Sequence, residues 1–542
     1  MVRGRVIIPV WLAMGAALFA FWWAEGRPVT LPDAPETASA CVSYAPFRAG
    51  QTPYDATLVI APQAIEEDLR LIAGRFSCVR TYTIRHGLTI VPEIARRFGL
   101  KVLLGAWIGR EANDNDIEIA AAVELANRFP DVVRTLIIGN EVLLRRELPA
   151  SGLAALLRKA RAGAHVPVTY ADVWDFWLQN PELGRDADAI MIHLLPYWED
   201  DPIPIETAAA HAASIYKRVQ AAFPGKPVVV GEAGWPSAGR MREGALPSLA
   251  NQARFAREIL TWGDRESIDV TLFEAFDQPW KRVQEGTVGG YWGHFSVERM
   301  SKFNFAGPIG GGSEWLERFA AAFALASIIV LGLALKAGVV GFAGSIVIAA
   351  AAGIAGTVII QEARHLVEAS TTLVEWTIGG GRLGLGILAA LIATLLTARP
   401  PRGRHVHSAR AALTELWRRD GTPRFTRAHF LALVRIVVLF GAAVTTLTLL
   451  FDARYREFPV TGYFLPAIVF AWLAWRDRNA ATDSDAAEEI FLARLIAIGG
   501  IAIGVNEGLQ NHQAWTWAAL SLVIGGGVGG GLLTGRKDAT AA

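Results

Sequence analysis

Two short apolar runs that each end in a glutamate decide the fold of this chain. The first is VVVGEAGWPS at residues 228–237, in which three valines lead to Gly231 and Glu232. The second is LIIGNE at residues 136–141, which ends in Asn140 and Glu141. Short runs of this kind, apolar on both faces, are typical of buried strands in a parallel sheet. A glutamate that closes such a strand is a poor core residue, because a buried carboxylate needs a partner.

The sequence around these two runs repeats the same pattern. Strand-like runs occur at residues 40–47, 78–84, 102–108, 135–144, 167–174, 189–197, 227–235 and 270–276. Amphipathic stretches lie between them, for example at residues 64–76, 117–129 and 153–162. Eight β–α units in about 290 residues predict a (β/α)₈ barrel, the TIM barrel, of class α/β. A doubly wound open sheet is the alternative, but no glycine-rich phosphate loop follows the first strand.

The composition shows that this barrel is only part of the molecule. Of 542 residues, 52% are hydrophobic and 19% are charged, and the mean hydropathy is +0.31. Such an apolar excess indicates segments that dissolve in lipid. The 52 basic residues balance 51 acidic ones, which argues against nucleic acid as a partner, because phosphate binding requires a positive field.

Apolar runs at both ends predict the membrane segments. The run at residues 7–24 is long enough to span a bilayer. A cleavable signal peptide is the alternative, but Phe21, Trp22 and Trp23 stand where a signal peptidase requires small residues. Seven further runs are found at residues 319–335, 339–360, 376–397, 430–451, 463–475, 491–505 and 515–533. We therefore expect an N-terminal transmembrane anchor (1–25), a barrel domain (26–316) and a membrane domain of about seven helices (317–542).

Basic clusters predict how these segments are oriented. Arg3 and Arg5 precede the first run, and Arg536 and Lys537 follow the last. Between two of the runs, the segment 399–427 has arginines at positions 399, 402, 404, 410, 418, 419, 424 and 427. The positive-inside rule places all three clusters in the cytoplasm and the barrel outside it. The expected location is a bacterial inner membrane, with the catalytic domain in the periplasm and the lipid bilayer as a partner.

The two strand-ending glutamates, Glu141 and Glu232, indicate the chemistry. In a barrel, the carboxyl ends of strands four and seven face the same mouth, where active sites are built. A pair of carboxylates there suits cleavage of a glycosidic bond, in which one carboxyl group donates a proton and the other attacks the anomeric carbon. The alternative is that each glutamate caps a helix or forms an ion pair.

Several motifs resemble glycoside hydrolase family 17, the β-1,3-glucanases and glucanosyltransferases with a TIM-barrel fold. They are SYAP at residues 43–46, VRTY at 79–82, GNE at 139–141, PY at 196–197, GEAGWPS at 231–237 and FEAFDQPWK at 273–281. The resemblance covers about residues 38–305. In layout, the chain is similar to the membrane-bound rhizobial-type proteins of β-(1→6)-glucan synthesis in cyclic β-glucan production.

This resemblance implies roles for individual residues. It implies a retaining mechanism in which Glu141 is the acid/base and Glu232 is the nucleophile. Asn140 would hold the sugar 2-hydroxyl, and Tyr197 would orient the nucleophile. The implied substrate-binding residues are Tyr44, Arg80, Tyr82, Asn140, Tyr197, Trp235, Gln278, Trp280 and Lys281. Many family members have a glutamate at the position of Gln278, which leaves open how substrate is positioned near Lys281.

The other chemically notable residues receive more modest interpretations. Aromatic rings stack on β-linked glucose, and Tyr44, Tyr197, Trp235 and Trp280 are the expected sugar contacts. Cys41 and Cys78 begin the first two strands, as a disulfide or as two buried thiols. His193 on strand six reads as a structural histidine. No cluster has metal-ligand spacing, so we expect no metal and no cofactor.

The leading hypothesis is an enzyme that cleaves β-1,3-glucan and transfers the glucosyl unit, with formation of β-1,6 linkages in periplasmic or cyclic glucan synthesis. A simple β-1,3-glucan hydrolase is the nearest alternative. A glucan-binding transporter or receptor is the alternative from another class, which the paired glutamates disfavour. The membrane domain would serve as an anchor, in transport, or as a contact for a glucan synthase or export complex.

Overall fold

A computed structural model describes residues 2–36, 40–336, 342–398, 405–417, 425–476, 481–482 and 486–528. The chain forms two compact units. The barrel unit is Pro28–Gly310, and the helical unit combines Met1–Arg27 with Gly311–Ala542.

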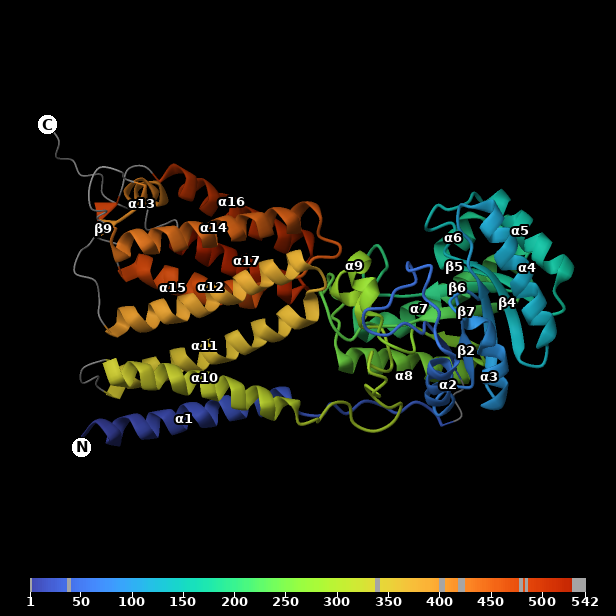
Figure 1. The fold of residues 1–542 in the computed structure, drawn as a ribbon, viewed down its shortest axis with the longest axis horizontal. Helices are drawn as coiled ribbons and strands as arrows, with labels where there is room; N and C mark the ends of the chain where they lie inside the picture. Colours follow the sequence, from blue (N-terminus) through green and yellow to red (C-terminus); the bar gives the residue numbers. More distant parts are fainter. Residues whose placement is uncertain are drawn as a thin grey trace. The chain divides into compact units, whose positions relative to one another are not determined.

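The barrel unit contains eight parallel strands that close in sequence order, so that β8 pairs with β1 (Figure 1). This closed parallel barrel confirms the predicted TIM-barrel-like fold. The strands are β1 Cys41–Ser43, β2 Cys78–Arg80, β3 Lys101–Ala106, β4 Val133–Asn140, β5 Val168–Val173, β6 Ile190–Leu194, β7 Val228–Ala233 and β8 Val270–Leu272. Most are shorter than the predicted runs, because the apolar sequence continues into the packed loops at the strand ends.

Helices surround the strands (Figure 1). They are α2 Pro62–Ala73, α3 Val91–Arg97, α4 Ala112–Arg128, α5 Ala150–Gly163, α6 Trp174–Gln179, α7 Ile205–Ala222, α8 Leu249–Glu266 and the short α9 Arg282–Glu285. In α8, Phe255 and Ile259 are buried four residues apart, the spacing that places two side chains on one face of a helix. This face covers the sheet, as a barrel helix requires.

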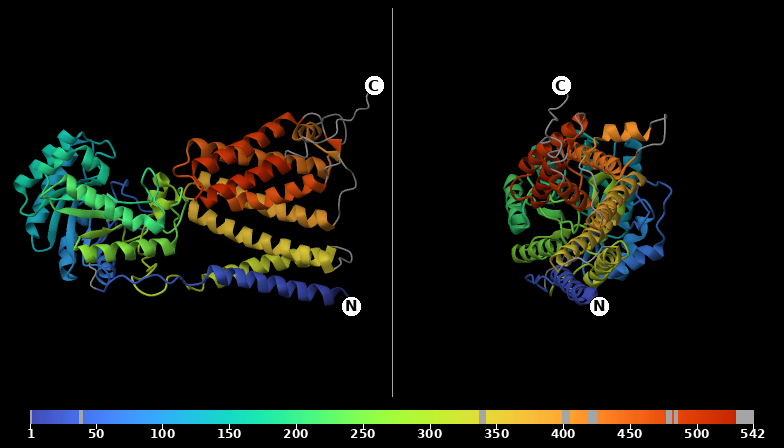
Figure 2. Two further views of the ribbon diagram at one scale, coloured as in Figure 1. Left: turned by 180° about the vertical axis from the view of Figure 1, so that it is seen from behind. Right: turned by 90° about the vertical axis from the view of Figure 1, so that its left-hand side faces the viewer.

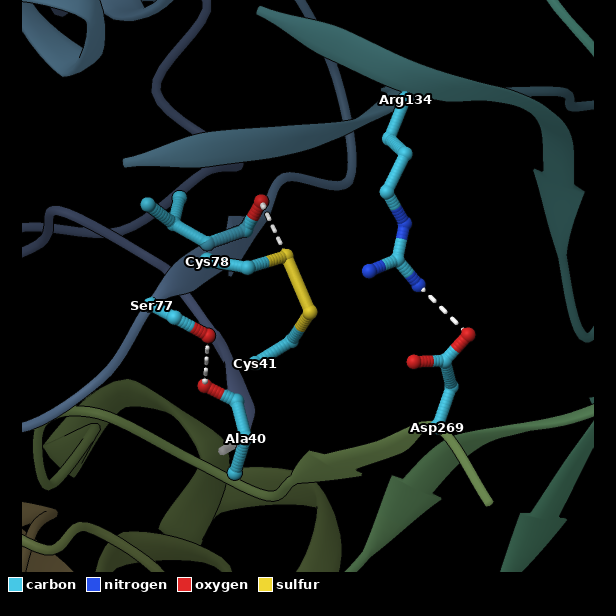
Figure 3. The surroundings of a disulfide bond; sticks show 7 residues. Ala40, Cys41, Ser77, Cys78, Arg134 and Asp269 are labelled. Atoms are coloured by element: carbon cyan, nitrogen blue, oxygen red, sulfur yellow. Dashed lines mark hydrogen bonds and ion pairs between the residues drawn. A yellow bond between two sulfur atoms is a disulfide. The ribbon is translucent and has the colours of Figure 1, made fainter. Parts of the chain in front are cut away.

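A disulfide bond between Cys41 and Cys78 lies at the amino-terminal end of the barrel (Figure 3). The two cysteines are register partners on β1 and β2, so the structure selects the disulfide from the two alternatives that the sequence left open. Nearby, Arg134 at the start of β4 forms a 2.8 Å ion pair with Asp269, which precedes β8. A disulfide and an ion pair therefore stabilise the amino-terminal end of the barrel. The site is expected at the opposite end, where the strands finish.

The helical unit contains the apolar segments. Its elements are α1 Val2–Glu25, α10 Glu314–Lys336, α11 Phe342–Ala369, α12 Leu373–Ala398, α13 Ala409–Leu416, α14 Arg427–Phe451, α15 Val460–Arg476, α16 Ala487–Asn506, α17 His512–Leu522 and the two-residue strands β9 His405–Val406 and β10 Ala481–Thr482. Figure 2 shows α1 alongside α10, and Trp11 of α1 donates a 2.8 Å hydrogen bond to Ser327 of α10. The N-terminal helix thus belongs to this unit.

Five of these helices are long and apolar enough to cross a membrane: α1, α10, α11, α12 and α14. The apolar α15 is a 17-residue helix, and α16 and α17 do not meet the same criterion within the described residues. Each of the eight predicted runs overlaps a helix, and the number of spans in the whole chain stays a prediction. Membrane crossing itself stays a prediction.

Two ion pairs between helices of the helical unit each contain a buried glutamate. Arg435 of α14 lies 2.8 Å from Glu489 of α16, and Arg382 of α12 lies 3.4 Å from Glu362 of α11. Among the charges that belong to the predicted basic clusters, only Arg410 and Arg427 and the backbone of Arg3 and Arg5 fall in the described part of the chain. The arginines at 399, 402, 404, 418, 419 and 424, together with Arg536 and Lys537, lie outside it.

Candidate active site

Glu141 follows β4 directly, and a glycine two residues earlier allows the backbone to turn there. Gly139 has φ +84°, and a Cβ on it would lie 2.6 Å from Val142. Glu141 has φ 53°, and its N–H donates a 2.8 Å hydrogen bond to the carbonyl of Ala171 on β5. Only glycine adopts the first conformation without steric cost. Gly139 is therefore required by the turn that directs Glu141.

Glu232 is the fifth residue of β7, and two side chains from the β2 region hold its carboxylate. Nη1 of Arg80 lies 2.7 Å from Oε1 of Glu232, and the hydroxyl of Tyr82 donates to the same oxygen at 2.8 Å. The Glu232 side chain is 4% exposed. A nearly buried carboxylate with a paired arginine and a tyrosine hydroxyl is fixed in one orientation as an anion.

Arg80 also contacts the residue that precedes each glutamate. Its Nη1 donates to the carbonyl of Gly231 at 2.8 Å, and its Nη2 donates to Oδ1 of Asn140. Arg80 is 1% exposed, so a carbohydrate has little direct access to it. The structure thus places Arg80 and Tyr82 behind the carboxylates as supports, and the implied role of each as a direct sugar contact stays a prediction.

The two carboxylates lie close together with a histidine beside them. One ligating atom from each of Glu141, His193 and Glu232 lies within 4.8 Å of the others. Nδ1 of His193 is 2.8 Å from Oε1 of Glu141, and its Nε2 is 3.7 Å from Oε1 of Glu232. The spacing would suit a metal ligand set, but Nη2 of Arg80 lies 3.4 Å from Nε2 of His193. A guanidinium in this place repels a metal cation, which is consistent with the expectation of no metal.

The segment after β8 adds a second charged pair, Lys281 and Glu274. Nζ of Lys281 lies 2.7 and 2.8 Å from the two carboxylate oxygens of Glu274. Burial raises the pKa of Glu274 to about 7, against the opposing charge of Lys281. Glu274 is therefore the carboxylate partner of Lys281.

Gln278 has a structural place instead. It is fully buried, and its amide donates to the carbonyl of Ala45 at 2.9 Å while its Oε1 accepts a 2.8 Å hydrogen bond from Nε1 of Trp280. A glutamine at this position thus anchors the Trp280 indole to the β1 loop. How substrate is positioned near Lys281, which the sequence left open, stays a prediction.

Glu285, the last residue of α9, is a further acid near the site. Burial raises its pKa to about 7; Lys281 opposes this rise, and the charges of Glu141 and Glu232 add to it. Sequence reasoning missed Glu285, because it stands in a polar stretch with no strand-end signal. When Glu285 is ionised, its negative charge would stabilise a cationic, oxocarbenium-like transition state.

The aromatic residues divide into buried and accessible groups. Tyr44, Tyr197 and Trp235 are each 1% exposed, so their rings have no open face for a sugar in this structure. The hydroxyl of Tyr197 donates its proton to the carbonyl of Arg240 at 2.7 Å, and the hydroxyl that reaches Glu232 is that of Tyr82. Trp280 is partly buried, with its ring 5.7 Å from that of the exposed Tyr54. Trp280 and Tyr54 are the better candidates for stacking.

Arg145 and Asp172 also surround Glu141, although sequence reasoning singled out neither. Arg145 lies over the ring of Trp107, 4.0 Å from its centroid, and donates to the carbonyl of Ile108 at 2.8 Å. Burial raises the pKa of Asp172 to about 6, the hydrogen bond from Tyr170 opposes this rise, and the charge of Glu141 adds to it. A position at the end of β5 was the available signal for Asp172.

Comparisons with known proteins identify a glycoside hydrolase domain in the barrel unit. Residues 41–293 match the BtgE/BtgC glycoside hydrolase domain. A glucan 1,3-beta-glucosidase of Schizosaccharomyces pombe is 30% identical over 254 residues, which cover 44% of this chain and 78% of that protein. A probable beta-glucosidase btgE of Aspergillus fumigatus is 26% identical over 263 residues, which cover 47% of this chain and 45% of that protein. This chain thus spans less than half of the length of the Aspergillus relative.

Among solved structures, this chain is similar to a glycoside hydrolase family 17 beta-1,3-glucanosyltransferase from Rhizomucor miehei. The identity is 26% and the TM-score 0.44, and the match covers 51% of this chain and 100% of the other. An active-site mutant of the Rhizomucor miehei beta-1,3-glucanosyltransferase, in complex with laminaritriose, has the same scores.

Proposed function

This chain belongs to the BtgE/BtgC family of glycoside hydrolases, and we propose that its barrel cleaves β-1,3-glucan by a retaining mechanism. The observation that carries the proposal is the spacing of the two carboxylates. Retaining glycosidases separate their two carboxyl groups by about 5–5.5 Å, whereas inverting enzymes leave about 6.5–9.5 Å for a water molecule. In this barrel, oxygens of Glu141 and Glu232 lie within 4.8 Å of each other, which favours retention.

The contacts of each carboxylate favour one assignment of roles. Oε1 of Glu232 accepts hydrogen bonds from Arg80 and Tyr82, which hold it as an anion suited to attack the anomeric carbon. Glu141 is more accessible, with 22% of its side chain exposed against 4% for Glu232. An accessible carboxyl group suits proton exchange with a leaving sugar and an incoming hydroxyl. We therefore assign Glu232 as the nucleophile and Glu141 as the acid/base.

In the first step, Glu141 gives its proton to the glycosidic oxygen as the C1–O bond breaks and a bond forms between C1 and Glu232. In the second, an incoming hydroxyl gives its proton to Glu141 as its oxygen bonds to C1 and the C1–Glu232 bond breaks. The substrate enters and the product leaves with the β configuration. Water as the incoming group gives hydrolysis, and a sugar gives transfer.

We propose that transfer is the main outcome and that some new linkages are β-1,6. Water is abundant, so a sugar acceptor succeeds only if the site holds it in line, where effective molarities can reach about 10⁵ M. The partly exposed pair of Trp280 and Tyr54, anchored through Gln278, is our candidate platform for it. Trp235 and Trp292, both buried, do not offer such a surface.

The test is product analysis with purified full-length protein and defined β-1,3-gluco-oligosaccharides at millimolar concentration. We expect products longer than the donor, with some 1→6 linkages. Trp280→Ala should lower the ratio of transfer to hydrolysis by about fivefold, the effect of one lost stacking contact of about 1 kcal/mol. Ile117→Ala, which removes an exposed apolar side chain of the outer helix α4, is the control. Only shortened glucans and glucose across this range would leave the hydrolase reading standing.

We further propose that the barrel lies in the periplasm of a bacterial inner membrane. Three features support this: the five apolar helices, the Cys41–Cys78 disulfide, which is typical of oxidising compartments, and the arginine-rich segment 399–427. Such a layout suits synthesis of a periplasmic or cyclic glucan, with a glucan synthase or export complex as partner.

Fusions of a phosphatase that is active only in the periplasm test this orientation. We expect activity from a fusion after Gly310, where the barrel unit ends, and none from a fusion after Gly421, inside the basic segment. Equal expression of the two fusions, measured by immunoblot, is the control. The opposite pattern of activity would overturn the orientation.

A further inference from the structure

His193 of β6 lies, fully buried, between the two carboxylates. Its Nδ1 is 2.8 Å from Oε1 of Glu141. Its second ring nitrogen, Nε2, is 3.7 Å from Oε1 of Glu232. Sequence reasoning treated His193 as structural. A structural histidine normally bonds to backbone groups, whereas both nitrogens of this one face side chains of the catalytic centre.

The neighbours of His193 assign its tautomer. The guanidinium of Arg80 only donates hydrogen bonds, and its Nη2 lies 3.4 Å from Nε2 of His193. Nε2 therefore carries the lone pair, and in the neutral ring the proton lies on Nδ1. That proton is donated to Oε1 of Glu141.

The backbone holds the imidazole in this place. His193 pairs in register with Val173 on β5 and with Glu232 on β7. Gly231 makes the packing feasible, since a Cβ there would lie 2.5 Å from Met191 and 3.4 Å from Cδ2 of His193. This glycine thus clears space for the strand-six side chains.

Charged and titratable groups surround His193 from four other strands and the loops that follow them. They are Arg80 and Tyr82 from the β2 region, Glu141 and Arg145 from the β4 region, Asp172 of β5 and Glu232 of β7. Glu285 adds negative charge near both glutamates. Of all these groups, only Glu141 receives the Nδ1 proton of His193.

We propose that His193 is a positioning residue for the acid/base. Its Nδ1–H holds Oε1 of Glu141, so that Oε2 is the oxygen presented to the substrate in both half-reactions. This inference rests on the retaining mechanism proposed above. Within the described residues, no protein hydrogen bond reaches Oε2 of Glu141, which leaves it open toward the mouth.

His193 exchanges no proton with the substrate in either half-reaction. In the first half-reaction, the proton on Oε2 moves to the leaving oxygen, and the bond from Nδ1 to Oε1 becomes a bond to an anion, which is stronger. In the second, the incoming hydroxyl returns a proton to Oε2. His193 neither gains nor loses a proton.

The pKa of Glu141 supplies a readout for this role. Burial raises this pKa, but the hydrogen bond and charge of His193, together with Arg145 and Arg80, lower it below its ordinary value. Glu141 must be protonated for the first step, so kcat/KM falls as the pH rises through its pKa. Loss of the His193 donor raises this pKa, and the alkaline limb moves to higher pH.

The test compares His193→Gln with His193→Asn in the full-length enzyme. Glutamine places a polar group where Nε2 stands, near Arg80, but gives no donor to Glu141. Asparagine keeps an N–H where Nδ1 stands. We expect His193→Gln to lower kcat with β-1,3-gluco-oligosaccharides about 100-fold and to move the alkaline limb of kcat/KM up by about one pH unit. His193→Asn should leave the limb near the wild-type pH and recover at least tenfold of the lost activity.

A dinitrophenyl β-laminaribioside provides the control, because its leaving group needs no proton. Its pre-steady-state burst, which reports the first step, should be nearly unchanged in His193→Gln. A limb that does not move in His193→Gln, or moves equally in both variants, would overturn the positioning role. An equal loss of the burst would indicate a general structural effect and would likewise overturn it. Failure of the wild-type enzyme to cleave β-1,3-glucan would instead contradict the proposed function.

Discussion

Glu232→Gln in the full-length protein is expected to lower kcat with β-1,3-gluco-oligosaccharides by about 10⁴-fold or more. This corresponds to about 5.4 kcal/mol on the activation barrier, because a neutral amide cannot form the bond to the anomeric carbon. Glutamine keeps an oxygen that can accept the hydrogen bonds of Arg80 and Tyr82, so the fold should survive. The measurement is the initial rate of donor cleavage, followed by chromatography of the products.

Glu232→Ala should be as inactive but less stable, since it leaves the buried Arg80 guanidinium without its carboxylate, and breaking a buried pair costs about 3–5 kcal/mol. Glu258→Ala is the control, because Glu258 lies on the outer helix α8 and pairs with Arg254. Activity of Glu232→Gln within about tenfold of wild type, a barrier change of ~1.4 kcal/mol, would exclude Glu232 as the nucleophile.

Glu141→Ala is expected to lower turnover of β-1,3-glucan by about 10³-fold, within the usual range for loss of a general acid. With a dinitrophenyl β-laminaribioside the covalent intermediate should still form, because this leaving group departs without a proton. Added azide should then restore turnover at least tenfold, since a small anion attacks the intermediate without help from a base. The expected product is a β-glycosyl azide, identified by NMR.

An α-glycosyl azide from Glu141→Ala would reverse the two roles, because it would show direct displacement by azide while Glu141 is absent. Glu124→Ala is the matched control, because Glu124 is an exposed residue of the outer helix α4. This variant should show near-wild-type rates and no response to azide.

The barrel could be predicted because each strand has its own local signal. The run at residues 228–237, for example, contains a valine-rich strand and a glutamate at its end, and β7 Val228–Ala233 lies within it. The strand lengths could not be predicted as well. The run at residues 40–47 contains only the three residues of β1 as a strand, because the following residues are buried by loop packing rather than by sheet pairing.

The residue that orients Glu232 could be identified only from the structure. Tyr82 and Tyr197 are both tyrosines near strand ends, so the sequence offers no basis for choosing between them. The choice depends on a hydrogen bond between residues 43 positions apart, in which the carbonyl of Arg240 accepts from the Tyr197 hydroxyl. Tyr82, in contrast, donates a hydrogen bond to Glu232, which is 150 residues later in the sequence. Such long-range contacts depend on loop conformations that local patterns do not encode.

His193 and Glu274 show the same limit for charged groups. The sequence placed His193 on strand six but could not determine whether its side chain points into the barrel. The register with Glu232 on β7 answers that question. In the same way, the sequence did not show that Lys281 pairs with Glu274, seven residues earlier in the same motif.

The most direct test of the central claim is the peptide that becomes labelled by a slow substrate, 2-deoxy-2-fluoro-β-laminaribiosyl fluoride. The fluorine slows breakdown of the covalent intermediate, so a retaining enzyme accumulates a glycosyl ester on its nucleophile. Peptide mass spectrometry of the full-length protein should find one fluoroglycosyl label, on Glu232, and none in Glu232→Gln. A label on Glu141, or no label in an enzyme that cleaves β-1,3-gluco-oligosaccharides with inversion, would contradict the account.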